Sequence, residues 1–109
     1  GASAVIEKDI AAAKLAQMVD ADLFMILTNV DKVCLNYETK EEEALDELSC
    51  EQATAYSAEN QFAEGTMLPK IQACVEFVYS KDNKKAIITS LSKAKDALYG
   101  RTGTLITKN

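Results

Sequence analysis

The sequence predicts an α/β sandwich with a largely parallel sheet, because short apolar runs alternate with segments of helical periodicity. The first run, Leu23–Leu27, has five consecutive apolar residues, which is typical of a strand buried on both faces. A second run, Ala86–Ile88, follows a long helical pattern that begins at Met67. With 109 residues, 48% hydrophobic and 27% charged, the chain is expected to form one small globular domain.

The first third of the chain predicts a helix and then two strands. Residues 7–19 are rich in alanine, and their apolar positions recur at helical spacing. Four residues are expected to share the apolar side of this helix: Ile6, Ile10, Ala13 and Met18. The strand Leu23–Leu27 follows, and Val33–Leu35 can form a second, shorter strand.

The middle of the chain predicts two helices separated by a glycine. Residues 50–60 form the first, with Ser49 as its N-cap. Gly65 interrupts the pattern, and Pro69 then falls in the first turn of the second helix, where its missing N–H costs little. The apolar positions of the second helix are Met67, Ile71, Cys74, Val75 and Val78.

The last third predicts the strand Ala86–Ile88, a helix at residues 92–98 that stops at Gly100, and a strand at Thr104–Ile106. Three or four short strands would leave a thin sheet with exposed edges. We therefore expect the chain to be part of a larger sheet.

A ligand site is expected where the two apolar strands end, because open α/β sheets bind ligands at the carboxyl ends of their strands. Residues 28–31 follow the first strand and residues 89–90 follow the later one. If these strands are parallel, both polar segments lie at the same edge of the sheet.

Charge and cysteine content restrict the partners and the compartment. The net charge of −5 disfavours nucleic acid or an anionic membrane as the main partner, since both require an excess of Lys and Arg. Cys34, Cys50 and Cys74 are widely spaced, so reduced thiols in a cytoplasmic protein are expected rather than disulfides or a zinc site. The chain has no histidine, which excludes nucleophiles activated by His.

Two segments carry charges suited to an anionic ligand. Lys8 and Asp9 lie at the start of the first helix, where the carboxylate could orient the cation; a solvated helix start is the alternative. In residues 65–70, Gly65 lets the backbone approach a ligand, a helix start favours anions, and Lys70 adds a positive charge. An ordinary loop capped by Thr66 is equally compatible with that segment.

A third segment, residues 28–37, is a polar loop in which Tyr37 could pack on a nucleotide base or belong to the core. Two lysines and an aspartate around an anion site would suit phosphoryl transfer. Such catalysis is mostly positioning and charge neutralisation, so it requires neither His nor Cys.

These motifs resemble those of carbamate kinases, which belong to the amino acid kinase family and have an open α/β/α sandwich fold. Residues Val5–Asp9 resemble the V-I-D-K-D stretch of carbamate kinases, and Leu27–Tyr37 resembles their strand and loop L-T-x-V-D-x-V-x-x-N-Y. Gln61–Lys70 resembles the F-x-x-G-S-M-x-P-K segment, and residues 86–91 resemble the closing strand. The match follows the same order over nearly the whole chain.

The resemblance implies reversible formation of ATP from ADP and carbamoyl phosphate, with Mg²⁺ carried on the nucleotide phosphates and no other metal site. Three residues would be catalytic: Lys8 at the transferring phosphoryl group, Asp9 as organiser of the lysines, and Lys70 at the β–γ bridge. Six would bind the nucleotide: Gly65 and Thr66 at the phosphates, and Thr28, Cys34, Tyr37 and Met67 around adenine and ribose.

Carbamate kinases are much longer than this chain, and their first half carries a Gly-rich phosphate loop, another lysine and the carbamate pocket. The chain is therefore expected to be the carboxyl-terminal, nucleotide-binding half, inactive without the missing amino-terminal half and homodimeric in the parent. Glu7, Lys32 and Thr66 depart from the usual pattern, and Asn29 also suits uridylate kinases. Another kinase branch and a non-catalytic nucleotide-binding or assembly module are the alternatives.

Overall fold

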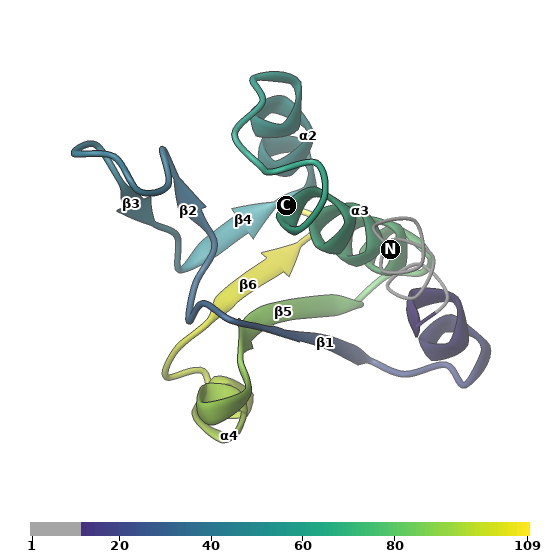
Figure 1. Cartoon of the computed structure of the whole chain (residues 1–109). Coiled ribbons are helices and arrows are strands. Elements are labelled where there is room, and N and C mark those ends of the chain that lie inside the picture. The colour runs from purple at the N-terminus through teal and green to yellow at the C-terminus, as the bar shows by residue number, and fades with distance from the viewer. Residues whose placement is uncertain (1–11) are drawn as a thin grey trace.

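The computed structural model describes residues 12–109, and its main feature is a four-stranded sheet with helices on both sides (Figure 1). The spatial order of the strands is β1 (Leu23–Thr28), β5 (Lys85–Ser90), β6 (Thr104–Thr107) and β4 (Glu47–Ser49). The pairs β1–β5 and β4–β6 are parallel, and β5–β6 is antiparallel. The α/β fold with a mainly parallel sheet, predicted from the sequence, is confirmed.

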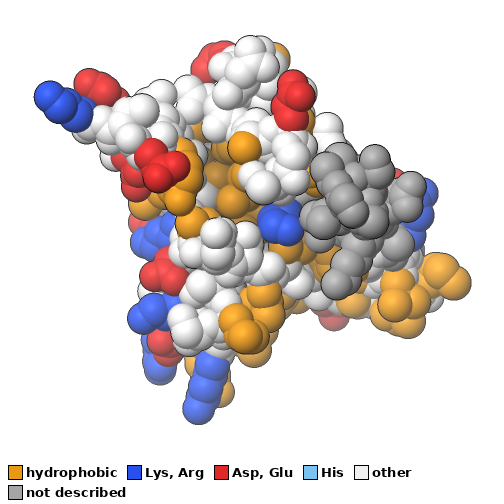
Figure 2. Space-filling view, viewed as in Figure 1, with side chains coloured by type: hydrophobic (Ala, Val, Ile, Leu, Met, Phe, Trp, Pro, Cys, Tyr) orange, Lys and Arg blue, Asp and Glu red, His pale blue; other side chains and the backbone are white. Residues whose placement is uncertain are grey.

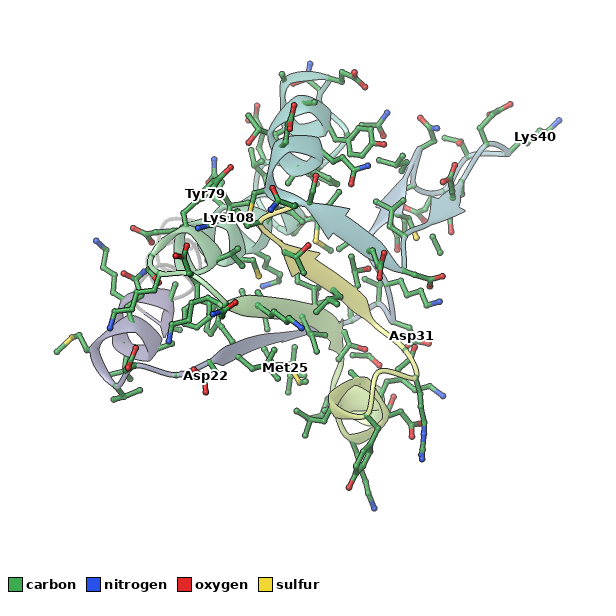
Figure 3. All side chains as sticks on the ribbon, turned by 180° about the vertical axis from the view of Figure 1, so that it is seen from behind. Asp22, Met25, Asp31, Lys40, Tyr79 and Lys108 are labelled. Atoms are coloured by element: carbon green, nitrogen blue, oxygen red, sulfur yellow. The ribbon has the colours of Figure 1, made fainter. Side chains whose placement is uncertain are left out.

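A second, two-stranded sheet protrudes from the body as a hairpin formed by β2 (Cys34–Leu35) and β3 (Glu43–Ala44). The predicted strand at Val33–Leu35 therefore exists, but it pairs within this hairpin and not within the main sheet. Lys40 lies at the tip, farthest from the main sheet in Figure 3.

The helices lie in two layers. Residues 12–18, α2 (Cys50–Ala58) and α3 (Met67–Tyr79) are on one side of the main sheet, while a 3₁₀ turn (Leu91–Lys93) and α4 (Ala94–Leu98) lie on the other (Figures 1 and 3). No helix among residues 12–109 is long and apolar enough to cross a membrane.

The core lies between α3 and the sheet. Phe77 on α3 is fully buried, and its ring centroid lies 5.4 Å from that of Phe24 on β1. Ile88 and Ile106, from β5 and β6, are also fully buried in the same cluster. Alternate residues of β1 are buried on the side of α3, whereas Met25 points to the side of α4 in Figure 3.

Local signals in the sequence explain where the helices begin and end. Ser49 caps α2 as predicted: its hydroxyl accepts the N–H of Gln52 at 3.0 Å, and the Gln52 side chain accepts the N–H of Ser49 at 3.0 Å. Gly100, with a φ of 73°, ends α4 as predicted, since the left-handed conformation costs glycine little.

Three features of the fold differ from the predictions or were not addressed by them. Strands β3 and β4 were not predicted, because two or three residues that include exposed glutamates carry no clear strand pattern. Strand β6 runs antiparallel to β5, because the short segment with α4 returns the chain at the same end of the sheet. Met18 is 82% exposed, so only Ala13 of the described apolar set is buried; Ile6 and Ile10 lie outside the described residues.

A buried lysine anchors the end of the first helical segment to the start of β5. Lys84 has a side chain that is only 5% exposed, and its ammonium lies 2.9 Å from Asp20 Oδ1 and 3.7 Å from Asp22 Oδ1. It also donates a hydrogen bond to the carbonyl of Ala21 and lies 5.8 Å from the ring centroid of Phe77. These partners compensate the ammonium for the water that it loses on burial.

Acidification is expected to remove the contribution of Asp20 to stability. Hydrogen bonds from Lys84 and Lys81 lower the pKa of this carboxyl group. A group whose pKa is lower in the folded state stabilises the fold above its unfolded pKa, and that stabilisation is lost as the pH falls through the folded pKa. Urea unfolding at neutral and at acidic pH measures the effect.

Asp20→Asn is the appropriate variant, because Asp20 has a φ of 54° and asparagine tolerates this left-handed conformation. We expect the variant to be less stable than the wild type at neutral pH and equally stable at a pH below the folded pKa of Asp20. A difference that stays constant with pH would show that this ion pair does not act as described.

Candidate functional site

The loops after β1 and β5 meet at one edge of the sheet, as the sequence predicted for parallel strands. Thr28, the last residue of β1, lies opposite Ser90, the last residue of β5. Asp31 connects the two ends: its carboxylate accepts the hydroxyl of Ser90 at 2.6 Å, and its carbonyl accepts the hydroxyl of Thr89 at 3.1 Å. These bonds fix the position of the loop after β1 relative to β5.

A cavity of about 170 Å³ opens beside this edge, between the hairpin and the start of α3. In Figure 2 the surface is hollowed there, hydrophobic side chains line the floor, and a basic side chain lies at the margin. The cavity is smaller than the roughly 300–1,000 Å³ that encloses a whole drug-sized ligand, so it suits one part of a ligand. Its lining residues are Thr28, Asn29, Val30, Lys32, Cys34, Tyr37, Gln61, Phe62, Ala63, Thr66 and Met67.

Five of the predicted nucleotide-binding residues line this one cavity. They come from three structural elements in two chain segments: Thr28 from the end of β1, Cys34 and Tyr37 from the hairpin, and Thr66 and Met67 from the start of α3. Tyr37 is 52% exposed, so it lies at the margin and not in the core. A cavity with apolar, aromatic and a few polar side chains can hold a planar heterocycle.

The other predicted site residues do not line the cavity or are outside the described part. Lys70 is partly buried in the first turn of α3, and Gly65 is exposed just before that helix. A Cβ added at Gly65 would meet nothing within 4 Å, so packing within residues 12–109 does not require glycine there. Lys8 and Asp9 lie outside the described residues.

Within residues 12–109, the start of α3 receives no capping hydrogen bond from its N-cap side chain. Thr66 occupies the N-cap position, but its side chain makes no capping hydrogen bond, which does not support the alternative of an ordinary loop capped by Thr66. The carbonyl of Ala63 accepts the N–H of Thr66 at 3.3 Å and that of Leu68 at 2.9 Å. This tight turn brings the segment before α3 against the cavity, and the positive end of the helix dipole favours an anion nearby.

Two polar side chains in the cavity have partners within the protein. Lys32 forms an ion pair with Asp46, which holds its ammonium toward the β3–β4 connection. Burial and then the nearby Glu42 carboxylate raise the pKa of the Cys34 thiol. Cys34 therefore remains protonated at neutral pH and is a poor nucleophile. Within residues 12–109, no group of three or more metal-ligating side chains could hold a metal ion.

Gln61, Phe62 and Ala63 form one wall of the cavity, and the sequence-based interpretation gave them no role. The glutamine could not be assigned because its partner is 25 positions away in the chain. Phe62, only 4% exposed, had a usable signal: a single aromatic residue in an otherwise polar stretch just before the glycine.

This chain is similar in sequence to a known protein family. The sequence profile of the amino acid kinase family matches residues 1–90. The chain belongs to the amino acid kinase family. Its relatives in the family include the carbamate kinase of Clostridium perfringens, 53% identical over 99% of this chain and 34% of that protein. Carbamate kinase 2 of Staphylococcus aureus is 47% identical over 97% of this chain and 34% of that protein.

Solved structures agree with this family assignment. A carbamate kinase from Giardia lamblia bound to AMP-PNP superposes with a TM-score of 0.87 at 42% identity, covering 94% of this chain and 32% of that chain. The uridylate kinase of Archaeoglobus fulgidus shares the fold with a TM-score of 0.67 at 22% identity, covering 91% of this chain and 46% of that chain. The chain thus spans about a third of the carbamate kinases that it matches.

Proposed function

We propose that this chain is the carboxyl-terminal, nucleotide-binding part of a cytoplasmic carbamate kinase that transfers a phosphoryl group reversibly between carbamoyl phosphate and ADP. One observation carries the proposal: residues from two distant segments, each within a motif that resembles carbamate kinases, line a single cavity at the carboxyl edge of the sheet. Among the superposed structures, the identity of 42% to a carbamate kinase, against 22% to a uridylate kinase, favours this branch of the family.

In this proposal the base of ADP lies in the cavity. Tyr37, Met67 and the buried Phe62 supply apolar contact, and Thr28 supplies a hydroxyl for hydrogen bonding. An aromatic side chain at the margin can cover the face of a base without excluding the ribose from solvent.

The phosphates would extend from the cavity toward Gly65, Thr66 and the start of α3. The uncapped start of α3 suits an anion, and exposed Gly65 lets the phosphates approach the backbone. Lys70, in the first turn of α3, adds a full positive charge there.

The chemistry would consist of charge neutralisation along the transferring group. Lys70 would stabilise the charge that develops on the β–γ bridge, and Mg²⁺ would enter with the nucleotide as part of the substrate. Lys8 and Asp9 would complete the site, with Lys8 at the phosphoryl group and Asp9 holding the lysines in position. The remaining two thirds of a carbamate kinase would supply the carbamate pocket, within a homodimer.

The direct test is ATP formation from carbamoyl phosphate and ADP with Mg²⁺. The 109 residues would replace the matching third of the Clostridium perfringens carbamate kinase in a chimera, assayed beside the chain alone. We expect an active chimera and an inactive isolated chain that still binds ADP. A folded chimera that neither binds ADP nor forms ATP would contradict the proposal. ADP binding without turnover in the chimera would instead favour a non-catalytic nucleotide-binding module.

A further inference from the structure

A reciprocal pair of hydrogen bonds joins the two walls of the cavity. The backbone N–H of Asn36 donates to Oε1 of Gln61 at 2.8 Å, and Nε2 of Gln61 donates to Oδ1 of Asn36 at 3.2 Å. Asn36 follows β2 in the hairpin, and Gln61 follows α2, so the pair connects elements 25 residues apart. Neither residue has a role in the function proposed above.

Each partner is held in position by its own backbone. Helix α2 ends at Ala58 and is followed by the left-handed Asn60, with a φ of 61°; the N–H of Gln61 donates to the carbonyl of Tyr56 at 3.1 Å. This turn directs the chain from α2 toward the hairpin. Asn36 is also left-handed, with a φ of 52°, a conformation that asparagine adopts more readily than most residues.

Both residues of the pair are adjacent in the chain to residues that line the cavity. The carbonyl of Asn36 accepts the hydroxyl of Thr39 at 2.6 Å and its N–H at 3.1 Å, which closes the turn that carries Tyr37. On the other side, Gln61 is followed immediately by Phe62 and Ala63, which line the cavity. A change in the distance between Asn36 and Gln61 therefore changes the distance between the two walls.

We propose that Asn36 and Gln61 form a clasp that sets the width of this cavity, and that both are positioning residues for the planar group bound there. This inference rests on the proposed function in one respect, namely that the planar group is the base of ADP. The clasp itself is a property of the protein alone and can be measured without a nucleotide.

The first measurement is the rate at which iodoacetamide alkylates Cys34, read by mass spectrometry at a fixed pH. Cys34 lines the cavity and is partly exposed, whereas Cys50 and Cys74 are fully buried, so labelling reports the opening of this site. In Gln61→Ala we expect the rate to rise about three- to tenfold, equivalent to the net contribution of one neutral hydrogen bond, because both bonds of the pair are exposed to water. Asn36→Gly should give a smaller rise, because glycine keeps the left-handed backbone and the N–H that donates to Gln61 but removes Oδ1.

The matched control is Gln72→Ala, an exposed glutamine on α3 that does not line the cavity. Its alkylation rate should equal that of the wild type, and circular dichroism should give the same folded fraction for all variants. An unchanged rate in Gln61→Ala, or an equal rise in Gln72→Ala, would overturn the clasp.

A second measurement separates the clasp from the proposed function. In the wild type, ADP should protect Cys34 and should bind more tightly than ADP carrying a benzyl group on N6. Gln61→Ala should bind ADP about three- to tenfold more weakly and discriminate less against the bulky analogue, while its affinity for pyrophosphate stays unchanged. Failure of ADP to protect the wild type would contradict the proposed function, while the alkylation rates would still decide the clasp. If Gln61→Ala lost affinity for ADP and for pyrophosphate equally, the clasp would not determine the width of the cavity.

Discussion

Lys70→Ala, in a carbamate kinase chimera that carries this chain, is expected to lower kcat by about 10²–10³-fold. Removing one group that stabilises charge in a transition state typically costs about this much. Lys70 lies one turn into α3, beyond the cavity that would hold the base, where a nucleotide would extend its phosphates. Since the charge on the β–γ bridge develops during transfer, the KM for ADP should change far less than kcat.

Two further variants define the role of Lys70. Lys70→Arg keeps the charge and should recover part of the rate, although the guanidinium differs in shape from the ammonium. Lys95→Ala removes an exposed lysine from α4, on the other side of the sheet, and should leave kcat unchanged. A rise in KM with an unchanged kcat for Lys70→Ala would contradict the transition-state role and indicate simple binding of the nucleotide.

Local signals in the sequence were sufficient for the elements with a strong pattern of their own. The five apolar residues of β1, the Ser49 cap of α2 and the glycine after α4 each predicted an element that the structure contains. The sequence predicted that the loops after β1 and β5 would lie at one edge if these strands were parallel, and the structure meets that condition. The motif at residues 61–70 was also correctly located at the start of a helix.

Features that depend on distant partners were not predictable in the same way. Strand β4 exists because three residues pair with β6, more than 50 positions later, and not because of their own propensity. The bond between Asn36 and Gln61 and the burial of Lys84 beside Asp20 likewise require the tertiary fold. The cavity illustrates both cases, since motifs predicted five of its residues and missed the wall formed by residues 61–63.

Thr104→Val is expected to destabilise the protein by about 2–4 kcal/mol, because it leaves two buried backbone groups without a partner. Thr104 is fully buried in β6, and its hydroxyl accepts the N–H of Val33 at 2.8 Å and donates to the carbonyl of Leu45 at 2.6 Å. Valine has almost the same shape as threonine but cannot make either bond. Urea unfolding with a linear extrapolation measures the loss, and an unchanged slope would show that the effect is on stability alone.

Thr104→Ser is the matched control, because it keeps the hydroxyl and removes only one methyl group. It should cost about 1 kcal/mol, so the ranking wild type, serine, valine separates the hydrogen bonds from packing volume. If the valine variant were as stable as the serine variant, the hydroxyl of Thr104 would not be the group that attaches the hairpin to the main sheet. Val33 immediately precedes Cys34, and Leu45 immediately follows β3, so this hydroxyl ties both ends of the hairpin to the main sheet. Thr104→Val should therefore also raise the alkylation rate of Cys34, which links the stability of the sheet to the geometry of the cavity wall.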